Sequence, residues 1–404
     1  MKSRFFFISL IFASLACVLP TVSIETPPDT SAQVATAVAL TLQASTQVAA
    51  TPVSANAVLP RGLYYMANDN QSVSQVFRVE RDGKTITQLT SEFSGVTDYD
   101  VSPIDGSIVY ESGVQLVWLN ADASNRRVLV DGTPNSNNRG YYHPVFSPDG
   151  QTIAYRRDGL YLYSVASGAS DLVFADHPLG GSLPPEIYQP NVFSPDGTKL
   201  LIDIGHPPDS PYTGAIYTLA TNVLQQFGGE DQSMTCCTLY GGPQWAADSS
   251  AFYTPATIPD SSSIFSVLWK VDANSGAVTQ LLPGGAGEGD TRLMYLTYEP
   301  YLAPEGHVYF FSAKYPELEG FDRRVPMVIV RADPSDMMTS WTILRGDISE
   351  MVNEVLWAPD ASFVIVTVAP SADIHDSGRA EILYFDGRPN IVLTQVAKQM
   401  KWGP

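Results

Sequence analysis

The hydrophobic positions of this chain fall in short runs that recur at a regular spacing. Within residues 141–174, apolar and aromatic runs at 142–146, 153–155, 160–163 and 171–174 are separated by residues typical of turns. Short runs rich in β-branched and aromatic residues, bounded by turn residues, predict β-strands. Each such segment therefore predicts a four-stranded antiparallel meander, whose strands we call a, b, c and d.

The turn between strands a and b repeats as a phrase along the chain. It reads Phe-Ser-Pro-Asp-Gly at 146–150 and again at 193–197, with weaker copies elsewhere. Pro sets φ for the second position of a type I turn, and Gly suits the fourth. Taking the Ser or its equivalent as a marker, the copies stand at positions 102, 147, 194, 246, 303, 358 and 403. This spacing indicates one supersecondary unit stacked many times.

Repeated sheets of this size predict a β-propeller, because each blade covers the apolar faces of its neighbours. No part of the repeat region shows a sustained helical period, which argues against an α/β alternation. The predicted fold class is therefore all-β: a seven-bladed β-propeller, with six blades as the alternative if one of the weaker repeats is an insertion.

The two ends of the repeat region complete one blade between them. Before the first marker the chain has strands b, c and d at 63–66, 75–79 and 85–89, without a strand a. Residues 396–404 form a strand a with nothing after it. We therefore predict a ring closed by N- and C-terminal strands that share one blade.

Two charged residues occupy equivalent positions in this closure. Asp100 and Lys401 each stand two residues before a marker, on the inner strands of neighbouring blades. We predict that they meet near the central channel, where each charge offsets the desolvation of the other.

The phrase followed by an apolar strand, as in Phe193 to Ile202, resembles the repeat of TolB-type or WD40-like propellers. It is also similar to the propellers of prolyl-oligopeptidase-like enzymes. The resemblance covers roughly residues 61–404 and implies the fold. It implies little about function, since the residues before 61 do not resemble the α/β domain that precedes the TolB propeller.

Residues 1–16 are predicted to be a signal peptide. Lys2 and Arg4 precede an apolar run from Phe5 to Leu15 that is too short to span a bilayer as a mature helix. The junction before Cys17 resembles a bacterial lipoprotein cleavage site, with Cys17 as the lipidated residue, although Ser14 stands where that family prefers Leu. We expect an extracytoplasmic lipoprotein; a secreted or periplasmic protein and an uncleaved anchor are the alternatives.

Residues 17–60 are predicted to be a low-complexity linker, and 61–404 the propeller domain. Between 31 and 60 there is no charged residue, and Ala, Thr, Val, Gln, Ser and Pro supply most of the stretch. This composition is typical of a stalk that lifts a domain off a membrane, or of a plain disordered linker.

The charge of the chain restricts its partners. Forty-two acidic residues against 23 basic ones give a net charge of −19. This balance argues against nucleic acid and anionic membrane surfaces, so we expect membrane contact only through a lipid anchor. Cys236 and Cys237 are adjacent, and either a strained disulfide or two thiols would fit.

Motifs that would identify an enzyme are missing from the sequence. It has no G-x-S-x-G elbow, no H-E-x-x-H, no P-loop and no G-x-G-x-x-G after a strand. Asp149 and Asp196 belong to the repeated turn and are not expected to be catalytic. We predict no cofactor; a divalent cation is the open alternative, with its metal ligands unknown.

The two faces of the predicted ring differ in their loops. The a-to-b turns are the short phrases, whereas the d-to-a and b-to-c links on the other face are long and irregular. Long loops on a rigid scaffold are where binding usually resides. On this long-loop face, the candidate binding residues are Tyr142, His143, Tyr188, Tyr298, Glu299, His375 and Asp376.

The function predicted from these observations is a non-enzymatic, monomeric binding module at the cell envelope. It would present its long-loop face to a protein or glycan partner. The alternative is a carbohydrate-active enzyme, a lyase or hydrolase, with a metal- or carboxylate-based site at the channel mouth.

Overall fold

The computed structural model describes the following residues: 57–132, 142–177, 180–181, 183–205, 212–227, 239–240, 242–260, 263–282, 294–315, 326–337, 339–348 and 351–404. Residues 56–404 form one compact unit, and the fold is that of this unit. The predicted signal peptide, Cys17 and the Cys236–Cys237 pair lie outside the described residues. Within the described part, no helix is long and apolar enough to cross a membrane.

The described elements are β-strands in six antiparallel sheets. Three of these sheets, each of four strands, follow one another directly along the chain. The first holds β4 (Asp98–Val101), β5 (Ile108–Ser112), β6 (Gln115–Leu119) and β7 (Arg127–Asp131). The second holds β8 (Val145–Phe146), β9 (Thr152–Arg156), β10 (Gly159–Ser164) and β11 (Ser170–Ala175). The third holds β12 (Ile187–Phe193), β13 (Lys199–Gly205), β14 (Tyr212–Thr218) and β15 (Val223–Gln226).

The next two sheets continue the same meander. One holds β16 (Leu239–Tyr240), β17 (Gln244–Trp245), β18 (Ala251–Asp260), β19 (Ser263–Asp272) and β20 (Val278–Leu282), with β16 and β17 both paired to β18. The other holds β21 (Met294–Leu302), β22 (Val308–Tyr315), β23 (Met327–Ala332) and β24 (Thr342–Ile348). The predicted strand order a-b-c-d is the observed order in these sheets.

The last sheet has seven strands and joins the two ends of the unit. It runs β25 (Val352–Trp357), β26 (Phe363–Val368), β27 (Gly378–Tyr384), β28 (Ile391–Trp402), β1 (Leu63–Asn68), β2 (Ser74–Val79) and β3 (Ile86–Gln88). Its width comes from β28, which pairs with β27 through its first half and with β1 through its second.

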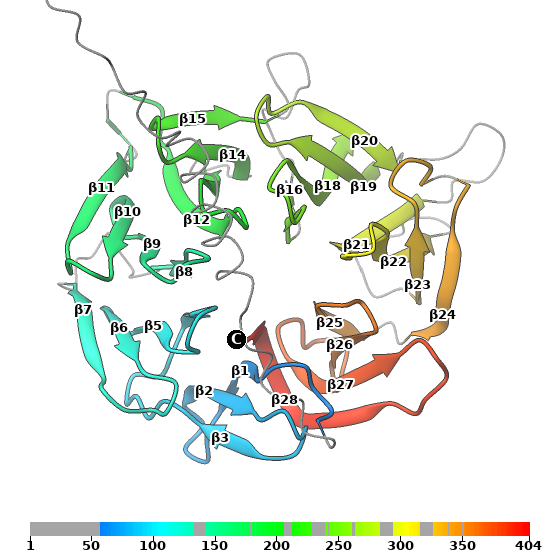
Figure 1. The fold of residues 1–404 in the computed structure, drawn as a ribbon, viewed down its shortest axis with the longest axis horizontal. Coiled ribbons are helices and arrows are strands. Elements are labelled where there is room, and N and C mark those ends of the chain that lie inside the picture. The colour runs from blue at the N-terminus through cyan, green and yellow to red at the C-terminus, as the bar shows by residue number, and fades with distance from the viewer. Residues whose placement is uncertain are drawn as a thin grey trace, which may run out of the picture. The chain divides into compact units, whose positions relative to one another are not determined.

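The register of β28 confirms the predicted closure by terminal strands. Leu63 lies opposite Trp402, and Tyr64 lies opposite Lys401. Figure 1 shows the sheets set around a ring, with β1, β28 and the C terminus near its middle. The chain is an all-β propeller, and its seven-blade count stays a prediction.

The core lies between neighbouring sheets. One apolar cluster joins Tyr64 and Val76 of β1–β2 to Tyr99, Ile108 and Val117 of the next sheet, and comparable clusters fill the other interfaces. Burying apolar area in this way is the main favourable contribution to folding. Because each sheet covers its neighbour, the inner strands are fixed in place from both sides.

The repeated phrase is a self-supporting turn. Ser147 donates from its hydroxyl to Asp149 at 2.6 Å and accepts the Thr152 N–H at 2.9 Å, while Gly150 takes a φ of +66°. Ser194 makes the equivalent bond to Asp196 at 2.6 Å. The carboxylates of the phrase are therefore used within the turn.

Candidate functional site

Five polar residues occupy one level of the inner strands. They share the position four residues before a turn marker, in consecutive meanders of the ring, and we call them the polar arc: Glu299, Glu354, Gln399, Asp98 and His143. The two other equivalent positions hold Pro190 and Gly242, which have no polar side chain. The polar side chains at this level are therefore gathered on one side of the ring.

The arc lies toward the long-loop end of the channel. Every inner strand runs from the long-loop face to its repeated turn. A residue four positions before the marker therefore lies nearer the long-loop face than a residue two positions before it. Around the middle of Figure 1, β21, β25 and β28 carry three of these residues. Asp98 begins β4, and His143 precedes β8. The topology thus brings residues from both ends of the unit to one place.

Three arc residues have left-handed backbone. The φ angles are +43° at His143, +47° at Glu299 and +50° at Gln399. For residues with a Cβ this conformation costs on the order of 1–2 kcal/mol, and such strain tends to be kept at functional sites. The strand register also shifts between Tyr298 and Tyr301 in β21. The same local strain at three equivalent positions points to a site.

Hydrogen bonds from both neighbours hold Gln399 in this conformation. The Tyr99 hydroxyl donates to the Gln399 carbonyl oxygen at 2.6 Å. On the other side, Glu354 Oε1 accepts the Met400 N–H at 2.6 Å, and the Gln399 N–H also bonds to the Glu354 carboxylate. The remaining side-chain oxygens, Glu354 Oε2 and Gln399 Oε1, are buried and have no hydrogen-bond partner among the described residues.

Two carboxyl groups of the arc hold protons more tightly than usual. Burial, and after it the negative charge of Glu354, raises the pKa of Glu299 to about 7. Burial also raises the pKa of Glu354 to about 7, against the lowering effect of its backbone hydrogen bonds and of Lys401. Gly242 leaves room for the first of these groups, since a Cβ there would lie 3.2 Å from Glu299 Oε2.

Basic residues beside the arc are already paired. His143 Nδ1 lies 2.8 Å from Asp98 Oδ2, and Lys401 Nζ lies 2.8 Å from Asp100 Oδ1. Burial alone would lower the pKa of Lys401, but the charges of Asp100 and Asp98 outweigh it and leave that pKa raised. The ammonium of Lys401 is therefore charged and used inside the ring.

Two further carboxylates stand one strand outward. Glu111 of β5 accepts the Tyr142 N–H at 2.9 Å, and burial raises the pKa of Glu111 to about 7. Asp203 of β13 accepts a bond from Asn191 at 2.9 Å, and burial raises its pKa. Together with Asp100 and the three carboxylates of the arc they form what we call the acidic channel mouth: Asp98, Asp100, Glu111, Asp203, Glu299 and Glu354.

The structure separates the predicted binding residues into three groups. His143 and Glu299 belong to the arc. Tyr142 and Tyr188 are buried, and their hydroxyls donate to the Val114 carbonyl at 2.6 Å and to Glu186 at 2.5 Å, so their rings pack inside the molecule. Both were predicted as contact residues on the long-loop face. Their burial follows from packing between neighbouring sheets, which places Tyr142 in a cluster with Val109 and Leu116 and Tyr188 in one with Leu160 and Phe174.

The other predicted residues lie beside the arc or farther out. Tyr298 is half-buried and packs against the cluster that contains Trp357. His375 and Asp376 are exposed in the link between β26 and β27, where Asp376 Oδ2 lies 3.4 Å from Lys398 Nζ. Sequence reasoning did not single out Glu354 or Gln399, although their shared offset from the turn marker could have identified them.

An exposed aromatic side chain stands on the long-loop face. Phe93, in the link between β3 and β4, is 100% exposed. Its loop is held by Glu92, whose carboxylate accepts bonds from Tyr110 at 2.6 Å and Arg126 at 2.7 Å. Gln75 Oε1 accepts the Glu92 N–H at 3.0 Å. The ring of Phe93 is thus displayed to solvent on a braced loop.

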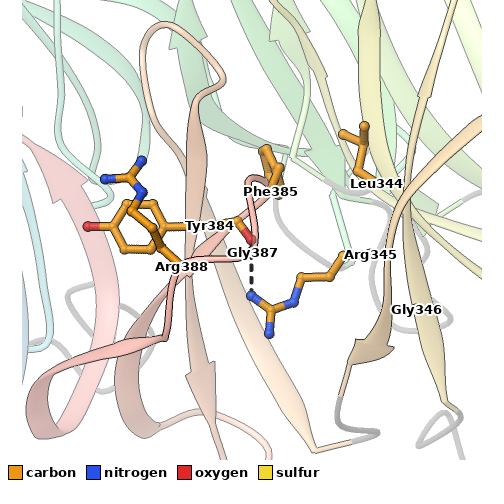
Figure 2. Close-up of a pocket in the computed structure, with 7 residues that line it drawn as sticks. All are labelled: Leu344, Arg345, Gly346, Tyr384, Phe385, Gly387 and Arg388. Atoms are coloured by element: carbon orange, nitrogen blue, oxygen red, sulfur yellow. Dashed lines mark hydrogen bonds between the residues drawn. The ribbon is translucent and has the colours of Figure 1, made fainter.

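A hollow lies between β24 and the end of β27, lined by Leu344, Arg345, Gly346, Tyr384, Phe385, Gly387 and Arg388. Figure 2 shows Arg345 reaching the Tyr384 carbonyl oxygen, at 3.1 Å, and it also donates to Asn390 at 2.9 Å. Arg388 stacks over the Tyr384 ring at 3.9 Å and pairs with Asp386 at 2.8 Å. Because both guanidinium groups already have partners, we assign no ligand to this hollow.

Within the described ranges, no group of three or more His, Cys, Asp or Glu residues is placed to hold a metal ion. The carboxylates of the channel mouth are spread over several blades and largely bonded to protein groups. What this site offers is negative charge and hydrogen-bond acceptors.

Comparisons with known proteins bear on the fold. No protein-family model matches the chain, and no curated protein matches its sequence. Among solved structures, an oligogalacturonate lyase in complex with manganese is 13% identical, covers 82% of this chain and 84% of its own, and has a TM-score of 0.53. A prolyl endopeptidase structure is 12% identical, covers 86% of this chain and 50% of its own, and has a TM-score of 0.55.

The putative TolB from Agrobacterium tumefaciens is 16% identical, covers 77% of this chain and 99% of its own, and has a TM-score of 0.42. That TM-score supports no further conclusion. At identities of 12% and 13%, the similarity to the lyase and the endopeptidase shows the fold alone.

Proposed function

We propose that this chain is a non-enzymatic extracytoplasmic binding module that presents its long-loop face and acidic channel mouth to a protein or glycan partner. The observation that carries the proposal is the polar arc. Five equivalent inner-strand positions bear polar side chains, and three of them keep a strained backbone. A folded scaffold retains such strain where the positions serve binding.

Two features of the long-loop face support this role. The inner strands are packed from both sides, so the arc needs little ordering when a partner arrives, and a preorganised surface lowers the entropic cost of association. Phe93 adds a wide apolar contact on the same face, and exposed aromatic residues are frequent anchors in protein interfaces.

The cellular setting remains part of the proposal. We propose lipid anchoring through Cys17, residues 17–60 as a linker to the propeller, and a monomeric, seven-bladed ring. Radiolabelled palmitate incorporation, lost in Cys17→Ser, would test the anchor; equal labelling of both proteins would contradict it.

Partner capture with matched surface variants tests the binding role. The intact protein would be cross-linked in its native envelope fraction, and the partner identified and produced for binding measurements. Phe93→Ser on the long-loop face should weaken binding about 10-fold or more, since burying a Phe side chain contributes roughly 1.5–3 kcal/mol. Ile104→Ser removes an apolar side chain that is 62% exposed on the opposite face, and it should change affinity less than twofold. If only Ile104→Ser weakened binding, the contact would lie on the opposite face, and the proposed binding face would be wrong.

A carbohydrate-active enzyme is the second candidate function. It is favoured by Glu299 and Glu354, two buried carboxyl groups whose pKa values near 7 suit proton transfer at neutral pH. One structural neighbour is an oligogalacturonate lyase solved with manganese. Incubating the protein with oligogalacturonate, with and without manganese, tests this directly. Unsaturated or hydrolysed products that disappear in Glu299→Gln would replace the binding proposal with an enzymatic one.

A further inference from the structure

The polar arc has more acceptors than donors. Glu354 Oε2 and Gln399 Oε1 are buried, and no described residue donates a hydrogen bond to either. The Glu299 carboxyl lies within the electrostatic influence of Glu354, and burial together with that charge raises its pKa. Unpaired buried acceptors are unfavourable, and nearly all those in folded proteins find a donor.

Another part of the same ring shows how this imbalance is relieved. On the opposite side of Gln399, the Lys401 ammonium lies 2.8 Å from Asp100 Oδ1 and 5.5 Å from the centre of the Tyr99 ring. An ammonium group thus supplies both the donors and the positive charge that buried carboxylates require. Among the residues that the structure describes, no ammonium or guanidinium group forms an ion pair with Glu299 or Glu354.

A metal ion fits these acceptors less well than an organic cation. No group of three or more His, Cys, Asp or Glu in the described ranges could hold a metal. Glu354 Oε1 is already committed to backbone N–H groups, which leaves one oxygen from this residue. An ammonium needs only acceptors, since it carries three N–H donors and a full charge.

We infer that the polar arc binds a protonated primary amine, with Glu299 and Glu354 as the carboxylates that pair with it and Gln399 Oε1 as an additional acceptor. This inference rests on the proposed binding function and names the chemistry of the ligand. A lysine side chain of a protein partner and an amino sugar of a glycan share this group.

Proton release provides a second signature. The pKa values of Glu299 and Glu354 are raised to about 7, so both are partly protonated near pH 7. The charge of Glu354 acts on Glu299, and that of Lys401 of β28 acts on Glu354, while Asp98 and His143 are paired together. A bound ammonium favours the carboxylates, and its binding should therefore release protons at pH 7.

The test is calorimetry on the intact chain at pH 7, in two buffers that differ in protonation enthalpy. The probes are Nα-acetyl-lysine methylamide and D-glucosamine, with Nα-acetyl-norleucine methylamide and D-glucose as uncharged counterparts. We expect at least one amine to bind 10-fold or more tightly than its counterpart, with a buffer-dependent heat that reports proton release. The amine that binds better identifies the source as protein or glycan.

Conservative variants assign the site. Glu299→Gln and Glu354→Gln should each weaken amine binding 10-fold or more and reduce proton release. Asp373→Asn removes the same charge from an exposed loop position and should leave both within twofold. Thermal unfolding of each variant checks that it is folded. If a variant does not fold, the wild-type comparison of amine with uncharged counterpart still decides.

Three results would overturn the inference: neither amine binds better than its counterpart, binding is unchanged in both variants, or manganese binds at the arc and neither amine does. A failure here is distinguishable from failure of the binding role. If partner binding is still lost in Phe93→Ser while the amines do not bind, the module stands and only the ligand chemistry is wrong.

Discussion

Lys401 Nζ lies 2.8 Å from Asp100 Oδ1, although the two residues are 301 positions apart in the chain. Asp100 Oδ2 accepts the Phe146 N–H at 2.7 Å, so one carboxylate connects the inner strands β28, β4 and β8. This contact was predicted from their shared offset from the turn marker, and the structure confirms it. The ion pair therefore ties the C-terminal strand into the ring.

Removing the lysine should destabilise the ring. Lys401→Met leaves Asp100, whose side chain is 16% exposed, without its charge partner. The expected loss is on the order of 2–3 kcal/mol of unfolding free energy, between the values for exposed and buried pairs. Urea unfolding measures it. Lys398→Met is the matched control, because its partner Asp376 is 71% exposed, and it should lose less than about 0.5 kcal/mol.

Asp100→Asn in the Lys401→Met background should recover part of the loss, because it removes the unpaired charge. Equal losses in Lys401→Met and Lys398→Met would contradict a structural role for the pair.

Deleting residues 396–404 should open the ring. The deletion removes the part of β28 that pairs with β1 and exposes the edge of that strand. An unpaired edge promotes association with other chains. We expect a lower thermal midpoint and oligomers in light scattering. A monomer with an unchanged midpoint would contradict closure by the terminal strands, and with it the seven-blade count.

Stability should fall as the pH rises from 5.5 to 8. Burial raises the pKa values of Glu111, Glu299 and Glu354 to about 7, whereas an unfolded glutamate has a pKa of about 4.3. Between these values the folded state binds more protons, so its stability is lost as the pH rises toward 7 and levels off above it. Each group should contribute about 1–2 kcal/mol over this range.

Urea unfolding at the two pH values checks this dependence. Glu299→Gln should flatten it by that amount, whereas Asp373→Asn should not change it. A pH dependence that is the same in Glu299→Gln, Glu354→Gln and wild type would show that these groups do not hold their protons in the folded state.

Relieving backbone strain at the arc should raise the stability of the fold and weaken ligand binding. Gln399 has a φ of +50°, which glycine adopts without steric cost. Gln399→Gly should therefore be stabilising by about 0.5–1 kcal/mol while weakening amine binding. Gln395→Gly, the same substitution at an exposed position of β28 with ordinary backbone, should be destabilising. Loss of stability in Gln399→Gly as large as in Gln395→Gly would show that the left-handed backbone stores no strain.

The sequence by itself determined the repeat, the strand order and the closure. These follow from local chemistry: the Ser-Pro-Asp-Gly turn fixes where strands a and b meet, and alternation of apolar residues fixes which faces are buried. Because hydrogen-bond register along a strand is set by its turn, equal offsets from the marker predicted that Asp100 and Lys401 would be neighbours. The position of a residue within its repeat can therefore be determined from the sequence alone.

Exposure and pairing at the site were decided only by the tertiary structure. Tyr142 and Tyr188 were predicted as contact residues because they lie beside long links, yet both rings are buried in the packing between neighbouring sheets. Glu299 was predicted as a loop carboxylate, but its left-handed backbone and its raised pKa depend on what packs beside it. Glu354 and Gln399 became a site through contacts between β25 and β28. Sequence spacing fixes a residue's height on its strand, whereas its burial and partners depend on what packs beside it.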